Sequence, residues 1–140
     1  MRPTTLDRQL ITVSACLMFG AGTAGACGEA LLGATRTIEG KGYVVVFKTV
    51  PDPIVVGEHF ALDFAVCPRA KGEAPHSVRV DASMPEHRHG MNYRPVVTAR
   101  AADAYRADGL MFHMPGRWDL VFDVVGGGAT ERLTGTMRVE

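Results

Sequence analysis

The chain has 140 residues, of which 46% are hydrophobic and 21% are charged, and this is the composition of a single folded domain. Its 15 Lys and Arg residues balance 15 Asp and Glu residues, so no basic surplus favours binding to nucleic acid or to an anionic membrane. The length excludes a TIM barrel, which takes about 250 residues.

The first 26 residues have the pattern of a secretory signal peptide. A charged start with Arg2 and Arg8 precedes a short apolar stretch over residues 10–19, and the segment ends in Ala24-Gly25-Ala26. This order is typical of a cleaved export signal, and the apolar stretch is shorter than the roughly 20 residues of a transmembrane helix. We therefore expect a periplasmic or secreted protein with no transmembrane segment after cleavage.

Cleavage after Ala26 would leave two cysteines, Cys27 and Cys67. An isolated pair in an oxidising compartment is a disulfide candidate. Two alternatives stay open: Cys27 carries a lipid anchor, or Cys67 is a buried thiol at the end of an apolar strand. Lipoprotein signals usually have a large aliphatic residue where this chain has Ala24, so the lipid-anchored form is the second choice.

From residue 41 onward, apolar and polar residues alternate, which is the pattern of β-strands with one buried face. Turns rich in Pro and Gly separate the alternating stretches. We expect Asp108-Gly109 to bend or bulge the fifth strand. The pattern predicts seven strands, over residues 42–49, 58–66, 77–84, 95–100, 104–114, 117–125 and 131–139.

Seven short antiparallel strands in about 100 residues favour an all-β, immunoglobulin-like two-sheet sandwich. The sandwich is expected over residues 41–140, and a small closed barrel is the alternative. Residues 27–40 form an N-terminal segment whose weak pattern allows a short edge strand.

Histidine and methionine are concentrated in two short windows, residues 84–91 and 111–114. These windows hold three of the five His and four of the seven Met of the chain. Thioether sulfur is soft and prefers Cu(I), whereas imidazole suits Cu(I), Cu(II) and zinc. Mixed His and Met in an exported domain therefore favours copper, and the lack of a C-x-x-C motif argues against structural zinc.

Residues two apart in an extended chain point to the same face. His87 and His89 are therefore expected to converge on one ion if residues 86–92 are extended, and Met111 and His113 would share a face. Alternation places Met84 and Met114 in the core, which makes them second choices. The candidate metal ligands are His87, His89, Met91, Met111, His113, Met84 and Met114.

Simpler roles remain open for these side chains. Residues 84–91 could be a polar or partner-binding loop in which His87 and His89 face water. Glu86 could hold the neighbouring imidazole in one tautomer. We expect His59 to be solvated and Trp118 to be a core anchor.

The two windows, in this order, resemble the YtkA-like domains and the related FixH-like proteins over about residues 41–139. The resemblance rests on Met84-Pro85-Glu86-His87-Arg88-His89-Gly90, then Arg94-Pro95, and then the segment from Gly109 to Leu120. It implies a small exported or membrane-tethered sandwich linked with copper handling or with assembly of copper-containing oxidases. The motif positions that carry over are Met84, His87, His89, Met114, Gly116 and Trp118, while Met91 and His113 depart from the usual family residues.

Together these features predict an exported copper-binding protein that carries or buffers Cu(I) or Cu(II) for a copper-accepting or membrane protein partner. The alternative is a metal-free immunoglobulin-like module that docks on an envelope or membrane protein. We expect no enzyme, because no Ser-His-Asp set with a G-x-S-x-G elbow can be assigned.

Overall fold

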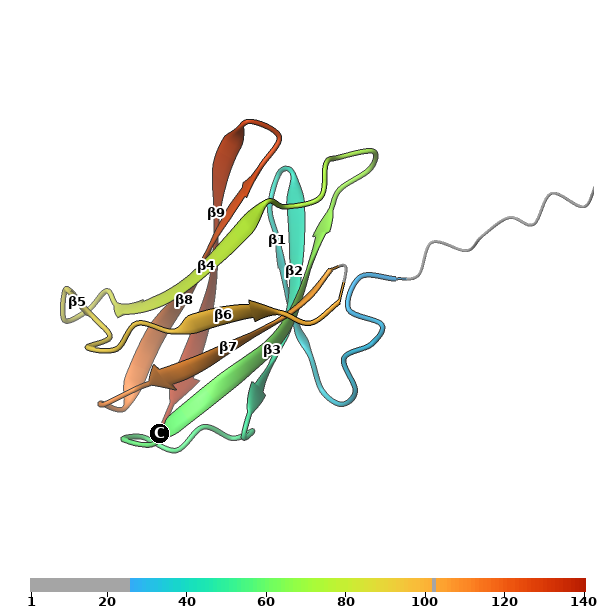
Figure 1. Ribbon diagram of the computed structural model, residues 1–140. Coiled ribbons are helices and arrows are strands. Elements are labelled where there is room, and N and C mark those ends of the chain that lie inside the picture. The colour runs from blue at the N-terminus through green and yellow to red at the C-terminus, as the bar shows by residue number, and fades with distance from the viewer. Residues whose placement is uncertain (1–25, 102) are drawn as a thin grey trace, which may run out of the picture.

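The protein is a sandwich of two antiparallel β-sheets (Figure 1). The computed structural model describes residues 26–101 and 103–140, so the predicted signal peptide lies outside the described residues except for Ala26. The described residues form nine strands: β1 (Arg36–Glu39), β2 (Tyr43–Val50), β3 (His59–Pro68), β4 (Ser77–Met84), β5 (His89–Gly90), β6 (Val96–Ala99), β7 (Ala104–Met111), β8 (Gly116–Gly126) and β9 (Ala129–Val139).

The first sheet has the strand order β1-β2-β3-β7-β6, and the second has the order β5-β4-β8-β9. The predicted immunoglobulin-like sandwich is therefore confirmed, with β1 as the short edge strand that the N-terminal segment allowed. Most strand ends lie within two residues of the prediction, β5 is a short strand that the alternation does not predict, and one strand end differs by more. The strand expected over residues 104–114 ends at Met111, because the chain leaves the first sheet there and enters β8 of the second sheet at Gly116.

A β-bulge interrupts β7 at the expected place. The register changes from Phe60 opposite Leu110 to Leu62 opposite Ala107, so β7 contains one extra residue at Asp108-Gly109. Gly109 has a φ of 87°, in the left-handed region that glycine adopts without strain. The bulge keeps Leu110 on the buried face, where it is fully covered.

The core lies between the two sheets and is richest in aromatic rings. The predicted alternation of β8 is confirmed, since Trp118, Leu120, Phe122 and Val124 are all 0% exposed. Phe122 packs edge to face against Phe64 of the first sheet, with ring centroids 5.3 Å apart. Such contacts join the sheets through side chains from strands that are distant in sequence.

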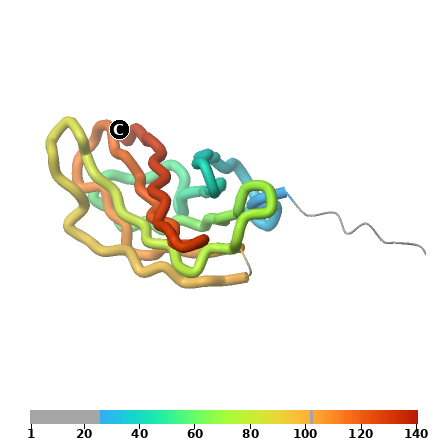
Figure 2. The backbone as a smooth tube through the Cα atoms, turned by 90° about the horizontal axis from the view of Figure 1, so that it is seen from above, coloured from blue at the N-terminus to red at the C-terminus, as the bar shows by residue number. Residues whose placement is uncertain are grey.

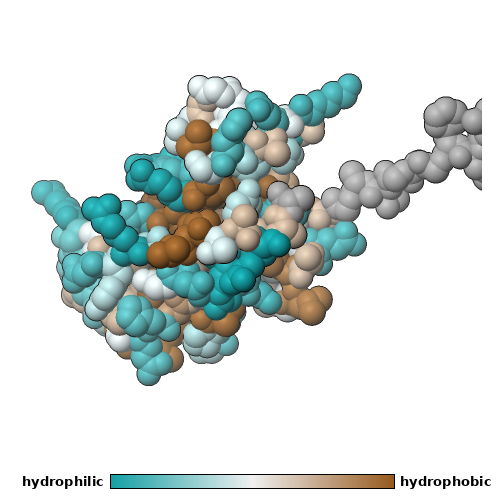
Figure 3. Space-filling model, viewed as in Figure 1, coloured by the Kyte–Doolittle hydropathy of each residue, from teal (hydrophilic) through white to brown (hydrophobic). Residues whose placement is uncertain are grey.

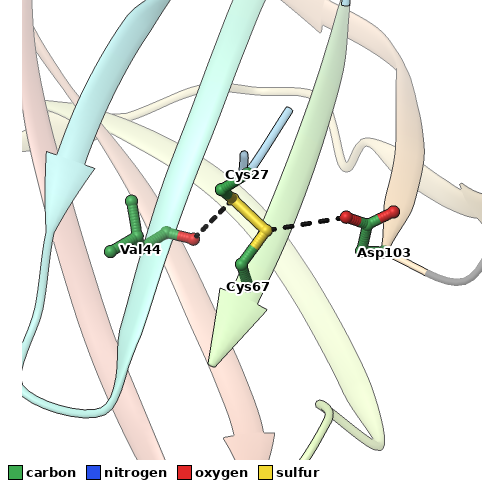
Figure 4. Close-up of a disulfide and its surroundings, with 4 residues drawn as sticks. All are labelled: Cys27, Val44, Cys67 and Asp103. Atoms are coloured by element: carbon green, nitrogen blue, oxygen red, sulfur yellow. Dashed lines mark hydrogen bonds between the residues drawn. A yellow bond between two sulfur atoms is a disulfide. The ribbon is translucent and has the colours of Figure 1, made fainter. Parts of the chain in front are cut away.

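A disulfide fastens the N-terminal segment to the outer face of the first sheet (Figure 4). Cys27 and Cys67 are bonded with their Cα atoms 5.8 Å apart. Next to the bond, Gly28 packs so closely on the outward-facing Val46 that a Cβ on the glycine would lie 2.9 Å from the valine Cβ. Of the three alternatives for the two cysteines, the structure contains the disulfide. The bond occupies the sulfur of Cys27 to which a lipid anchor would be attached.

The N-terminal segment and the turn between β4 and β5 lie at opposite ends of the sandwich (Figures 1 and 2). Changes to the disulfide are therefore expected to leave the opposite end intact. Within residues 26–101 and 103–140, no helix is long and apolar enough to cross a membrane.

Replacing both cysteines by serine, Cys27→Ser/Cys67→Ser, should lower stability. The bond closes a separation of 40 residues, and loss of that constraint on the unfolded chain costs about 4 kcal/mol in the chain-entropy account. Urea unfolding of the variant and the parent protein, followed by circular dichroism, measures the difference. An unchanged midpoint would show that the bond does not constrain the unfolded chain.

An ion pair joins the two longest strands at a directly opposed cross-strand position. Arg132 on β9 donates two hydrogen bonds to the carboxylate of Asp123 on β8, at 2.7 and 2.9 Å. These bonds hold the pKa of Asp123 below its ordinary value of 3.8. Because the folded pKa is lowered, the pair stabilises the fold above about pH 4, and this contribution is lost as the pH falls through the folded pKa.

The variant Arg132→Gln should therefore be slightly less stable than the parent protein at pH 7, and the difference should shrink as the pH falls toward 2. Denaturant unfolding at both pH values tests this, with NMR titration of the Asp123 carboxyl as a direct measure. A stability difference that is equally large at pH 2 would contradict the linkage.

Candidate metal centre

A tight turn, rather than an extended segment, joins β4 to β5. The N–H of His87 donates to the carbonyl of Met84 at 3.1 Å, and the N–H of Arg88 donates to the carbonyl of Pro85 at 3.3 Å. Arg88 has a φ of 56° and reverses the chain into β5, where His89 lies opposite Met84. The condition that residues 86–92 are extended is therefore not met, because a proline directly after β4 favours turn geometry over further alternation.

Three histidines from the two sequence windows meet beside this turn. The ring centroid of His89 lies 5.8 Å from that of His87 and 5.1 Å from that of His113. His113 lies in the connection between β7 and β8, so the contact joins residues that are 24 positions apart in the sequence. The two windows therefore meet in space, which spacing in the sequence left open.

These separations suit two imidazoles that share a metal ion. A metal about 2 Å from a ring nitrogen lies about 3 Å from the ring centroid, so two ligating rings have centroids about 5–6 Å apart. As the rings stand, no three His, Cys, Asp or Glu side chains among the described residues form a metal-binding group. The three rings form a row, and convergence on one ion requires rotation of the exposed His87 or completion of the site by thioethers.

The free ring nitrogens leave the histidines available as ligands. The Nδ1 atom of His113 is buried and has no hydrogen-bond partner among the described residues. The Nδ1 atom of His89 lies 3.3 Å from the carbonyl oxygen of Gly90, which is long for a hydrogen bond. Glu86 does not take the role of orienting the imidazole of His87, which the sequence left open, because its exposed carboxylate faces Arg117 across 3.7 Å.

Three of the candidate methionines lie near the histidine row and partly or fully within the core. Met84 is only 1% exposed, as the alternation of β4 predicts, and its Cε atom lies against Gly116 at the start of β8. Met91 and Met114 are partly buried and pack against the same core. These thioethers supply soft sulfur close to the imidazoles.

Met111 is placed differently from the other candidates. Its cross-strand partner on β3 is His59, and directly opposed residues point to the same face of a sheet. The ring of His59 in turn meets Tyr93 edge to face, with centroids 5.0 Å apart. Met111 therefore stands beside a fourth histidine, His59, which is exposed to solvent as expected.

An aromatic stack lies under the histidine row. Trp118 is fully buried and stacks on Phe112, with ring centroids 4.5 Å apart and an interplanar angle of 10°. The rings of His113 and His89 meet the indole edge to face at 5.3 and 6.0 Å. The indole N–H donates to the carbonyl of Met114 at 3.0 Å, which fixes the chain segment beside His113.

The sequence predicts Trp118 as a core anchor but not as a neighbour of the candidate ligands. The available signal was its position five residues after His113. Sequence spacing could not show that the indole turns back toward the imidazole, because that depends on the path of the chain between the two sheets.

Comparisons with known proteins identify the fold but not the family. No protein-family model matches the sequence, and no curated protein matches it. The structure is similar to the crystal structure of a DUF4426 family protein from Pseudomonas aeruginosa PAO1, with a TM-score of 0.51 and 8% sequence identity. The similarity covers 75% of this chain and 94% of that one. At this identity it supports the fold alone, so the YtkA-like and FixH-like resemblance stays a prediction.

Substituting Gly116 by alanine should destabilise the protein and displace Met84. Gly116 has a φ of 126°, and an added Cβ would lie 2.9 Å from the Met84 Cε. The matched control is Gly109→Ala, because Gly109 also has a positive φ but has no heavy atom within 4 Å of an added Cβ. Backbone strain costs about 1–3 kcal/mol at either site, so thermal unfolding should show the larger loss for Gly116→Ala. Equal losses would mean that Met84 accommodates the methyl group without cost.

Proposed function

We propose that this protein is an exported copper-binding protein that carries or buffers copper through a His/Met cluster beside the β4–β5 turn. The His/Met cluster consists of His87, His89 and His113 with the neighbouring thioethers of Met84, Met91 and Met114. The observation that carries the proposal is the 5.1 Å contact between the rings of His89 and His113, which come from different windows. A polar loop that merely faces water has no reason to bring two distant histidines together at a separation that suits a shared ion.

The chemistry of the surrounding side chains supports the same proposal. The unpartnered buried Nδ1 atom of His113 gains a partner when a metal binds, which removes the cost of an unsatisfied polar group. The primary ligands are His87, His89 and His113, with thioethers completing the set. This chemistry agrees with the copper handling that the YtkA-like resemblance implies.

A carrier must also release its ion. His87 is exposed and His89 is half-buried at the end of the sandwich, so an acceptor protein can reach the ion from this side. The buried thioether of Met84 and the indole of Trp118 hold the inner side of the site. A site that is open on one side and rigid on the other suits transfer of copper to a partner. This transfer would take place in the periplasm if the predicted signal peptide is used.

Copper titration of the processed, exported protein should show binding of one ion. The His87→Ala/His89→Ala double variant and the His113→Ala variant should each lose affinity, by more than the roughly 10- to 100-fold that loss of an outer-shell partner costs. The control is His76→Ala, because His76 is exposed and hydrogen-bonds Glu73 in a different loop. Isothermal titration and competition with a chelator measure the affinities. Binding that survives in both the double variant and His113→Ala would exclude this site.

A second candidate function is a metal-free module that docks on an envelope protein. Figure 3 shows apolar surface in the middle of the face between β4 and β6, surrounded by hydrophilic side chains. Val96 on the edge strand β6 is 67% exposed, and such an edge can accept a further strand. Under this function Val96→Lys would abolish the cellular role, whereas the His87→Ala/His89→Ala variant would preserve it.

A further inference from the structure

The inner wall of the candidate copper site is aromatic, and this bears on which copper ion the site would take. Phe112 covers one side of the Trp118 ring in a parallel stack, and both residues are 0% exposed. The rings of His89 and His113 both approach the same indole steeply, at interplanar angles of 67° and 79°. An ion held by these two imidazoles on the side of the indole would therefore lie next to an apolar π-surface.

The donor atoms near this wall are nitrogen and sulfur. Met84 is buried, Met91 and Met114 are half-buried, and all three pack with the core beneath the histidines. The nearest carboxylate in the turn, Glu86, already faces Arg117. Cu(II) favours nitrogen and oxygen ligands in a tetragonal arrangement, whereas Cu(I) accepts thioethers and few ligands.

The charges around the turn act in the same direction. Arg88 lies between His87 and His89 in the chain, and Arg117 lies beside Glu86, so these three charged groups sum to one positive charge. Coulomb repulsion of a divalent ion from this charge is twice that of a monovalent ion. The positive charge around the turn therefore repels a bound Cu(I) ion less than a bound Cu(II) ion.

We propose that the site takes Cu(I) in preference to Cu(II), and that the indole of Trp118 contributes directly by lying against the bound ion. This inference rests on the proposed function and names the form of copper that the protein carries. An aromatic face attracts a cation within about 6 Å of the ring centroid, and tryptophan does so more strongly than phenylalanine. The two imidazoles, the soft sulfurs and the indole together make a site whose inner side suits the monovalent ion.

The test compares the affinities of the processed protein for the two ions. Cu(I) is titrated without oxygen against bicinchoninate, and Cu(II) is titrated against nitrilotriacetate. We expect the affinity for Cu(I) to exceed that for Cu(II), in line with the preference of thioether ligands for Cu(I).

A graded series at Trp118 separates a direct contact from a structural role. Affinity for Cu(I) should fall in the order wild type, Trp118→Phe, Trp118→Leu, with a total loss of about fivefold to thirtyfold. Affinity for Cu(II) should change little. The matched control is Phe64→Leu, which removes an equally buried ring from the strand β3. Equal losses for both ions in the Trp118 series would overturn the direct contact.

A second readout needs no substitution in the core. Trp118 is the single tryptophan of the chain, so its fluorescence reports on the site without interference. Ag(I), a redox-inert substitute for Cu(I), should quench this fluorescence with a one-to-one endpoint, and the His89→Ala/His113→Ala variant should abolish the quenching. Saturation of the site by Ag(I) with unchanged fluorescence would overturn the role of the indole.

The outcomes also separate this inference from the proposed function. If neither copper ion shows histidine-dependent binding, both proposals fail. If Cu(II) binds through the same histidines as tightly as Cu(I), the copper-binding function stands and the preference for Cu(I) is wrong.

Discussion

The stack between Phe112 and Trp118 is the contact on which the rest of the candidate site depends. Phe112 directly follows β7 of the first sheet, and Trp118 is the first of the buried residues that alternate along β8 of the second sheet. Their stacking therefore joins the two sheets at one end. The hydrogen bond from the indole N–H to the Met114 carbonyl then fixes the connection between them. The position of His113 follows from this arrangement, because it lies between the two rings in the chain.

The β4–β5 hairpin brings the remaining candidate ligands to the same end. Met84 finishes the buried stripe of β4 and reaches Gly116, which sets the base of the hairpin against the start of β8. The turn that follows is tight enough to return His89 opposite Met84. The site is thus built from two chain connections that a common core holds in contact, and its inner side is as rigid as that core.

The two proposed functions, copper handling and docking, would use different parts of the molecule. The His/Met cluster lies at the end of the sandwich, whereas the apolar surface seen in Figure 3 lies on the face between β4 and β6. The disulfide that holds the N-terminal segment lies at the end opposite the turn (Figures 1 and 2). Variants at the disulfide, at the apolar surface and at the His/Met cluster can therefore test stability and the two proposed functions separately.

The sequence by itself determined the strands and their buried faces, because alternation with period two reports directly which side chains leave water. The stripe from Trp118 to Val124, the bulge at Asp108-Gly109 and the burial of Met84 all follow from that local rule. Tertiary structure alone decided that His89 meets His113 over the indole, and that Met111 stands beside His59 instead. Contacts between residues so far apart depend on how two sheets pack and where each connection turns, and no local pattern carries that information.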